Sequence, residues 1–262
     1  MDNRPIGIFD SGVGGTSVWR EIEKLLPNED TIYLADSKNA PYGEKSKEEI
    51  LQLSVKNIDF LLSRGCKLIV VACNTATTNA ISHVRKQYNV PFIGTEPAIK
   101  PAALRSKSKT VGVLATKGTL SSELFFATSQ NHAGHINKVV QVGTGLVPLI
   151  EAGKVHSEET KKLLQTYLEP MLAAGMDYLV LGCTHYPYLI PVLKEMIPPH
   201  VEILDSGAAI ARQTMAILKE NNLLANPEKE GDHQFYTNAD PDILASFLSD
   251  VEAKHKTAYL DF

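Results

Sequence analysis

Two similar segments of this sequence each end in a cysteine, and each cysteine follows an apolar run typical of a buried β-strand. Cys73 and Cys183 align when the second half of the chain is laid over the first, and the same offset places Gly65 on Gly175. A thiol can give up and take back a proton, which makes it a candidate general acid and base. Two matched thiols facing one pocket would suit a reaction carried out on both faces of a substrate.

The expected position of these cysteines also favours reactivity. Each is predicted where a strand passes into a helix, and the dipole and free N–H groups of a helix N-terminus can lower a thiol pKa from about 8.5. A single free cysteine is more often a buried, unreactive side chain, but the paired placement favours chemistry. Cys66, late in a predicted helix and without a polar partner, is expected to be unreactive.

A glycine-rich segment follows the first strand-like run. It is Asp10-Ser-Gly-Val-Gly-Gly-Thr16, which lacks the third glycine of a dinucleotide-binding fingerprint and the Gly-Lys-Ser/Thr of a P-loop. Two interpretations stay open: an anion-binding nest at a helix N-terminus, suited to a carboxylate, and a plain tight turn. Asp10 itself is either a helix cap or a proton acceptor.

His185 is a further acid/base candidate, because the ordinary pKa of histidine lies near neutral pH. Glu151, which follows an apolar stretch, is a candidate to orient that histidine. Cys183 and His185 could alternatively bind zinc together with Cys73, but no Cys-x-x-Cys or His-x-x-x-His spacing supplies the remaining ligands. No metal site is therefore predicted.

The composition is that of an ordinary soluble globular protein. The chain has 262 residues, of which 44% are apolar and 21% charged, and its net charge is −4. No run of Lys or Arg exceeds two residues, so neither nucleic acid nor an anionic membrane is an expected partner. No secretion signal or membrane-crossing stretch is recognisable. Three widely spaced cysteines suit reduced thiols in a cytoplasm.

Short apolar runs alternate with longer helical patterns, which is typical of an α/β fold with mostly parallel sheets covered by helices on both faces. A further similarity, between residues 6–11 and 111–116, supports two similar halves. Strands are predicted at 6–9, 31–35, 67–72, 92–93, 110–114, 139–142, 177–182 and 202–204, and helices at 46–63, 157–174 and 208–221. We expect a discontinuous domain formed by 1–97 and 206–262, and a second domain formed by 98–205.

Ligands of such sheets bind beyond the carboxyl ends of the strands. Asp10, Asp36, Cys73, Thr116 and Cys183 all fall at predicted strand ends. If the two sheets face each other with these ends together, the cleft between the domains gathers all five side chains. We therefore expect the active site in that cleft.

Several of these segments together resemble one known family. The matching motifs are Phe9-Asp-Ser-Gly-Val-Gly-Gly15, Ala35-Asp36 with Pro41-Tyr-Gly43, Ala72-Cys-Asn-Thr-Ala76, Thr116 with Gly118-Thr119, and Gly182-Cys-Thr-His-Tyr-Pro187. On these motifs the chain resembles the glutamate racemases of the cofactor-independent aspartate/glutamate racemase superfamily. The two cysteine motifs with their spacing are highly specific, and the others are supportive.

The resemblance implies two α/β domains related by a pseudo-two-fold axis, an active site between them, and a homodimer. It implies racemisation of glutamate by two bases without any cofactor, supplying D-glutamate for peptidoglycan. Cys73 and Cys183 would be the two acid/base residues. Asp10 would assist the first, and His185, oriented by Glu151, would assist the second. The residues expected to contact substrate are Asp10, Ser11, Tyr42, Gly43, Asn74, Thr75, Thr116, Thr119, Thr184 and His185.

Two alternatives stay open at this stage. Residue types do not separate glutamate from aspartate or a hydantoin, because one methylene changes binding by only about 1–3 kcal/mol. A non-catalytic small-molecule-binding or regulatory protein on the same scaffold is the second alternative. The presence of both thiols together with Asp10 and His185 favours an enzyme.

Overall fold

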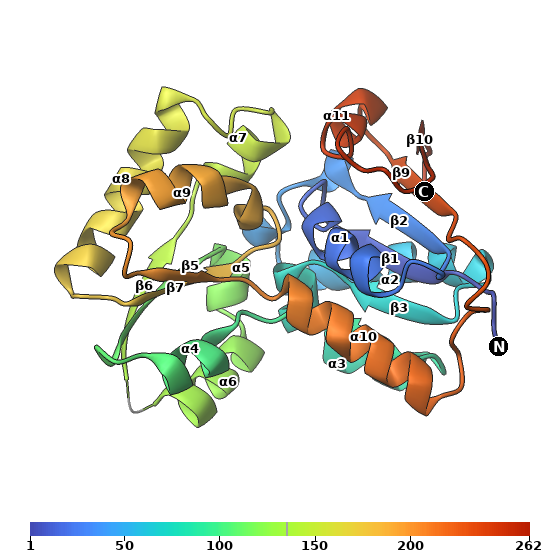
Figure 1. Cartoon of the computed structure of the whole chain (residues 1–262), viewed down its shortest axis with the longest axis horizontal. Coiled ribbons are helices and arrows are strands. Elements are labelled where there is room, and N and C mark those ends of the chain that lie inside the picture. Colours follow the sequence, from blue (N-terminus) through green and yellow to red (C-terminus); the bar gives the residue numbers. More distant parts are fainter. Residues whose placement is uncertain (135) are drawn as a thin grey trace.

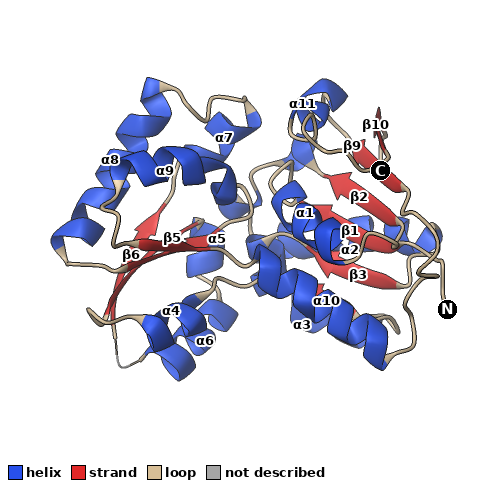
Figure 2. Ribbon diagram, in the orientation of Figure 1, coloured by secondary structure: helices blue, strands red, loops and turns tan. Residues whose placement is uncertain are grey.

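The strands of this computed structural model, which describes residues 1–134 and 136–262, assemble into two parallel sheets (Figure 1). The first contains β1 (Ile6–Asp10), β2 (Thr31–Ala35), β3 (Leu68–Val71), β4 (Phe92–Gly94), β9 (His233–Thr237) and β10 (His255–Tyr259). The second contains β5 (Thr110–Ala115), β6 (Asn137–Val142), β7 (Tyr178–Gly182) and β8 (Glu202–Leu204). Helices lie on both faces of each sheet (Figure 2).

The two sheets repeat one strand order. The first runs β10-β9-β2-β1-β3-β4 and the second runs β6-β5-β7-β8, so β2-β1-β3-β4 corresponds to β6-β5-β7-β8. The similarity between residues 6–11 and 111–116 is therefore a similarity between the central strands β1 and β5. The predicted fold, two similar α/β halves with parallel sheets, is confirmed.

Capping residues and glycines set the ends of several connecting helices. Ser46 begins α2 with a capping box, in which its hydroxyl accepts the Glu49 N–H and the Glu49 carboxylate accepts the Ser46 N–H. Gly65 and Gly175, after α2 and α8, have positive φ angles of 78° and 76°, a conformation that glycine adopts without steric cost. The helices are α1 (Thr16–Leu25), α2 (Lys47–Ser63), α3 (Asn74–Gln87), α4 (Ile99–Arg105), α5 (Lys117–Leu120), α6 (Glu123–Ala133), α7 (Leu146–Glu151), α8 (Glu158–Ala173), α9 (Ile190–Met196), α10 (Gly207–Glu220) and α11 (Pro241–Ser246), with short 3₁₀ turns η1 (Ser37–Asn39), η2 (Tyr42–Glu44) and η3 (Tyr186–Leu189).

After β8 the chain returns to the first sheet. Helix α10 packs against α1 (Figure 1), and β9 pairs with β2 and with β10. The strands β9 and β10 were not predicted, because neither is a continuous apolar run. Strand β9 nevertheless packs into the core through Phe235, whose ring centroid lies 4.7 Å from that of the fully buried Trp19.

The prediction that strands are buried on both faces holds for β1, β2, β3, β5 and β7, all of whose residues are buried. It is wrong for β6 and β8, where Val140 and Glu202 are exposed. Both strands lie at the edges of the second sheet. An edge strand is paired on one side only, so part of its surface reaches solvent.

Candidate active site

Both cysteine motifs line one pocket of about 250 Å³, where the carboxyl ends of strands from the two sheets meet. The residues that line it are Ser11, Pro41, Tyr42, Gly43, Cys73, Asn74, Thr75, Thr116, Val147, Cys183, Thr184 and His185. Ser11, Thr116 and Cys183 directly follow a strand, and Cys73 comes two residues after one. Asp10, Thr119 and Glu151 were also predicted at the site, and the structure places them behind this lining.

Cys73 is the N-cap of α3 and is 4% exposed. Its Sγ atom accepts the Ala76 N–H at 3.4 Å and donates to the Ser11 hydroxyl at 3.7 Å. Burial, followed by the charge of Asp10, raises the pKa of this thiol well above its ordinary value. The lowered pKa expected from a helix N-terminus is therefore wrong for Cys73, because the loss of solvation outweighs the contact with one amide.

Asp10 ends β1 and has no exposed surface. Its Oδ2 atom accepts the Gly15 N–H at 2.7 Å and the hydroxyl of Thr184, from the other half of the chain, at 3.4 Å. Burial raises the pKa of Asp10, and the charge of His185 and the Gly15 N–H oppose that rise. A carboxyl group with a raised pKa, beside a thiol, is suited to exchange a proton with it.

His185, which is 1% exposed, lies between a sulfur atom and a carboxylate. Its Nδ1 atom is 3.7 Å from Cys183 Sγ, and its Nε2 atom is 2.6 Å from Glu151 Oε1. Burial alone lowers the pKa of His185, but Cys183 and Glu151 reverse this and hold it well above its ordinary value. The imidazole is therefore kept positive, and it lies beside the Cys183 sulfur atom.

The glycine-rich turn between β1 and α1 binds two carboxylates of the protein itself. The Val13 N–H donates to Glu151 Oε1 at 2.8 Å, and the Gly15 N–H donates to Asp10 Oδ2 at 2.7 Å. The turn binds carboxylates through its backbone, as the first of the two interpretations expected, but each amide binds a different carboxylate and both belong to the protein. Both amides are therefore occupied by protein side chains and are not available to a ligand.

The glycines of this turn make room for the same side chains. A Cβ atom at Gly12 would lie 2.0 Å from Glu151 Oε1, and one at Gly14 would lie 2.3 Å from His185 Nδ1. No side chain fits at such distances, so each glycine is required by a group of the opposite half. No local sequence pattern indicated this requirement, because the two segments lie far apart along the chain.

The hydroxyl of Tyr42 is bound within the first half. It donates to Asp36 Oδ2 at 2.5 Å and accepts from Asn57 Nδ2 at 3.2 Å, while Asn238 donates to Asp36 Oδ1 at 2.6 Å. Tyr42 is therefore fixed by its own hydroxyl, and what it offers the pocket is its ring and backbone. Sequence reasoning missed Asn57, since nothing in a mid-helix asparagine points to a turn fifteen residues earlier.

Three threonine hydroxyls lie in mutual contact at the opposite wall. The Oγ1 atom of Thr75 is 2.7 Å from that of Thr116 and 3.3 Å from that of Thr119, and the last two are 3.0 Å apart. Asn79, also missed by sequence reasoning, donates to the carbonyl oxygens of Thr75 and Gly118 and so ties the two halves together. A hydroxyl cluster can turn its protons toward an anionic group of a ligand.

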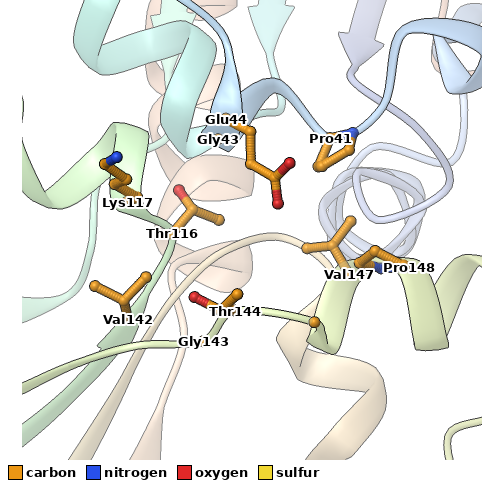
Figure 3. Close-up of a pocket in the computed structure, with 11 residues that line it drawn as sticks. Pro41, Gly43, Glu44, Thr116, Lys117, Val142, Gly143, Thr144, Val147 and Pro148 are labelled. Carbon is orange, nitrogen blue, oxygen red and sulfur yellow. The ribbon is translucent and has the colours of Figure 1, made fainter.

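A second pocket, of about 330 Å³, adjoins the first (Figure 3). Four residues line both pockets: Pro41, Gly43, Thr116 and Val147. Glu44 and Lys117 contribute the charges of the outer pocket, and Figure 3 shows the Glu44 carboxylate over it. The pocket lined by the two cysteines therefore continues into a space that carries one charge of each sign.

Among the described residues, no group of three or more His, Cys, Asp and Glu side chains is arranged to hold a metal ion. Within that same part of the chain, none of the helices has the length and apolar character needed to span a membrane. Cys66 lies outside the pocket lining, against Gly7, and burial raises its pKa to about 12. Such a thiol stays protonated and unreactive at neutral pH.

Residues 6–214 match the model of the Asp/Glu/Hydantoin racemase family. A glutamate racemase of Herpetosiphon aurantiacus is 47% identical, over 96% of this chain and 99% of its own length. The structure is similar to glutamate racemase isoform RacE1 of Bacillus anthracis, with a TM-score of 0.87 and 27% identity over 100% of this chain and 99% of that one. It is also similar to Escherichia coli glutamate racemase in complex with L-glutamate and the activator UDP-MurNAc-ala, with a TM-score of 0.84 and 35% identity over 98% of this chain and 100% of that one.

The family model covers most of the sequence, and the relatives match it over nearly their full length. The resemblance found in the cysteine motifs is thereby confirmed. The chain belongs to the Asp/Glu/Hydantoin racemase family and is an isomerase.

Proposed function

We propose that this enzyme interconverts L-glutamate and D-glutamate by proton transfer at Cα, with one thiol on each face of the substrate. The observation that carries the proposal is that Cys73 and Cys183, from two similar halves, line one pocket, and each has its own ionisable neighbour. Glutamate is proposed as substrate because the relatives that match nearly the whole chain are named glutamate racemases.

The electrostatics favour one starting state. Burial and the charge of Asp10 favour the neutral thiol of Cys73. The reaction needs one thiol and one thiolate, so we assign the thiolate to Cys183, beside His185. The thiolate would remove the Cα proton on its face, and the opposite thiol would donate its proton to the other face, which inverts the centre. The two cysteines then hold exchanged protonation states and return to the starting state through proton exchange with solvent or with their neighbours.

Acid/base groups placed in this way contribute about 10²- to 10⁴-fold each to a rate. The rest would come from dipoles directed at the substrate inside a water-poor pocket. We propose that the substrate carboxylates and ammonium contact the hydroxyls, amide and backbone of the lining, while Asp10 and Thr119 act from just behind it. The lining groups are those of Ser11, Tyr42, Gly43, Asn74, Thr75, Thr116, Thr184 and His185.

The proposed setting follows from the proposed reaction. D-glutamate made in the cytoplasm would supply peptidoglycan synthesis, and the enzyme would need no cofactor and would form a homodimer. We also propose a division into a domain of 1–97 with 206–262 and a domain of 98–205. The membership of β9 and β10 in the first sheet, and of β5 to β8 in the second, supports this division.

A polarimetric assay on the purified chain tests the function directly. L-glutamate, D-glutamate, L-aspartate and a hydantoin are supplied in turn without added metal or pyridoxal phosphate, and Cys73→Ala and Cys183→Ala serve as inactive controls. We expect both enantiomers of glutamate to approach a racemic mixture. A preference for aspartate or a hydantoin would reassign the substrate. If the optical rotation of every compound stayed constant, a binding protein would be favoured.

A further inference from the structure

His185 is linked to the first half of the chain in two ways: its side chain by way of Glu151, a residue of its own half, and its backbone directly. The side-chain support is Glu151, whose Oε1 atom also accepts the Val13 N–H. The backbone support is the docking of residues 184–188 on the first turn of α1. There the Ser17 hydroxyl donates to the Thr184 carbonyl oxygen at 2.8 Å, and the hydroxyls of Thr16 and Tyr188 are in hydrogen-bond contact.

The direction of that last contact follows from the other partner of Thr16. The Thr16 hydroxyl, with no exposed surface, donates to the Val13 carbonyl oxygen at 2.6 Å. It has one proton, so it accepts from Tyr188. Burial raises the pKa of Tyr188, which keeps the phenol protonated and able to donate. Val13 therefore anchors both supports, by its N–H through Glu151 and by its carbonyl oxygen through Thr16 and Tyr188.

The ring of Tyr188 is fixed as well as its hydroxyl. It packs edge-on against Phe247, with ring centroids 4.8 Å apart and an interplanar angle of 76°. Phe247 follows α11 and packs against the apolar cores of both halves, and Arg20 of α1 donates to its carbonyl oxygen at 2.6 Å. The phenol thus has little freedom to rotate away from Thr16.

Tyr188 lies in η3, the turn for which His185 is the N-cap, and its N–H donates to the His185 carbonyl oxygen at 3.2 Å. We propose that Tyr188, through its hydrogen bond to Thr16, is a positioning residue that fixes the His185 backbone and so aims the imidazole at Cys183. The proposal rests on the proposed function only in the role it gives His185.

Thiol alkylation tests this proposal without any racemase turnover. Full-length protein is treated with iodoacetamide at neutral pH, and the modification rates of Cys183 and Cys73 are measured in the same sample by peptide mass spectrometry. In Tyr188→Phe the rate ratio of Cys183 to Cys73 should fall about tenfold, the effect of one lost buried hydrogen bond on the alignment that stabilises the thiolate. Because both thiols line one pocket, general loosening would change both rates together and leave the ratio unaltered.

Matched variants separate positioning from folding. Thr16→Val should lower the ratio as Tyr188→Phe does, the double variant should lower it no further, and Thr16→Ser should restore it. Tyr88→Phe, which removes a phenol contact with Asp59 far from the pocket, should leave the ratio and the activity unchanged. The proposal is overturned if the ratio in folded Tyr188→Phe or Thr16→Val stays within about twofold of wild type. Absence of racemase activity in wild type with the expected ratios would instead contradict only the proposed function.

Discussion

The backbone N–H of Val13 donates to the carboxylate of Glu151 at 2.8 Å, joining two residues that lie in opposite halves of the chain. The same Oε1 atom lies 2.6 Å from His185 Nε2. The glycine-rich turn of the first half is therefore bonded to the carboxylate that contacts His185 in the second half. Substitutions in this turn should affect Cys183 although the turn follows β1.

Gly14→Ala tests that relation sterically. The new methyl would lie 2.3 Å from His185 Nδ1, so the imidazole must move away from Cys183. We expect kcat to fall by about 10²-fold or more, as for loss of an acid/base group, with little change in far-ultraviolet circular dichroism. Gly207→Ala is the control, because the nearest atom to its new Cβ would be Asp205 Oδ1, 3.1 Å away. Full activity in Gly14→Ala would show that the imidazole does not need its present position.

The three cysteines should differ sharply. Cys73→Ala and Cys183→Ala should each abolish racemisation from either enantiomer, because inversion needs a group on both faces. Cys66→Ala, which changes a thiol outside the pocket lining, should keep turnover within about threefold of wild type, with a modest loss of stability from the small cavity. Inactivity of a well-folded Cys66→Ala would show that the wrong thiols were assigned.

Isotope exchange should reveal two separate bases. In D₂O the donating thiol carries deuterium, while the thiolate that removes the Cα proton retains it on its own face. Early product should therefore contain deuterium at Cα, and recovered substrate should stay largely protiated, whichever enantiomer is supplied. Proton nuclear magnetic resonance of samples taken at low conversion measures both. Protium transferred into the product would indicate one base serving both faces.

Glu151→Gln should change the pH dependence of the rate. Glu151 helps to raise the pKa of His185, and a neutral amide removes that charge while preserving shape. The imidazole then loses its proton at a lower pH, so the alkaline limb of kcat/KM against pH should move toward neutrality. Glu158→Gln, in an exposed pair with Lys161, is the control and should leave the profile in place. An unmoved alkaline limb in Glu151→Gln would exclude this role.

His233 should make the fold sensitive to acid. Burial lowers its pKa from 6.5 to about 4, and its Nδ1 atom lies 2.9 Å from the Thr31 hydroxyl. As pH falls below 6.5, His233 becomes protonated in the unfolded chain, but in the folded chain it stays neutral until about pH 4. The contribution of His233 to stability is therefore complete above pH 6.5 and is lost as pH falls from 6.5 to about 4. The loss should reach about 3 kcal/mol.

Urea unfolding at several pH values measures this loss. His233→Gln cannot titrate and should show a smaller decline in unfolding free energy between neutral pH and the acid side. The comparison uses the change with pH and not the absolute stability, since the substitution also disturbs packing around Trp19. Equal declines in the two proteins would show that His233 does not titrate as described.

Local patterns in the sequence determined the α/β class, the repeat and the placement of both cysteines after strands. These features depend on short-range chemistry: the apolar runs of β3 and β7, the positive φ angles of Gly65 and Gly175, and the caps of the helices. The repeat could be recognised because equivalent turns require equivalent residues. The family resemblance rested on the same local motifs.

Tertiary structure alone decided what surrounds each thiol. The pKa of Cys73 rises because the surrounding fold buries the thiol, whereas the sequence indicated only the adjacent helix N-terminus. The partners of the glycine-rich turn and of Tyr188 lie in the opposite half, so no local pattern could name them. The strands β9 and β10 likewise depend on pairing beside β2 and on packing against Trp19. Interactions between residues far apart along the chain are fixed by packing of the whole, which local sequence does not encode.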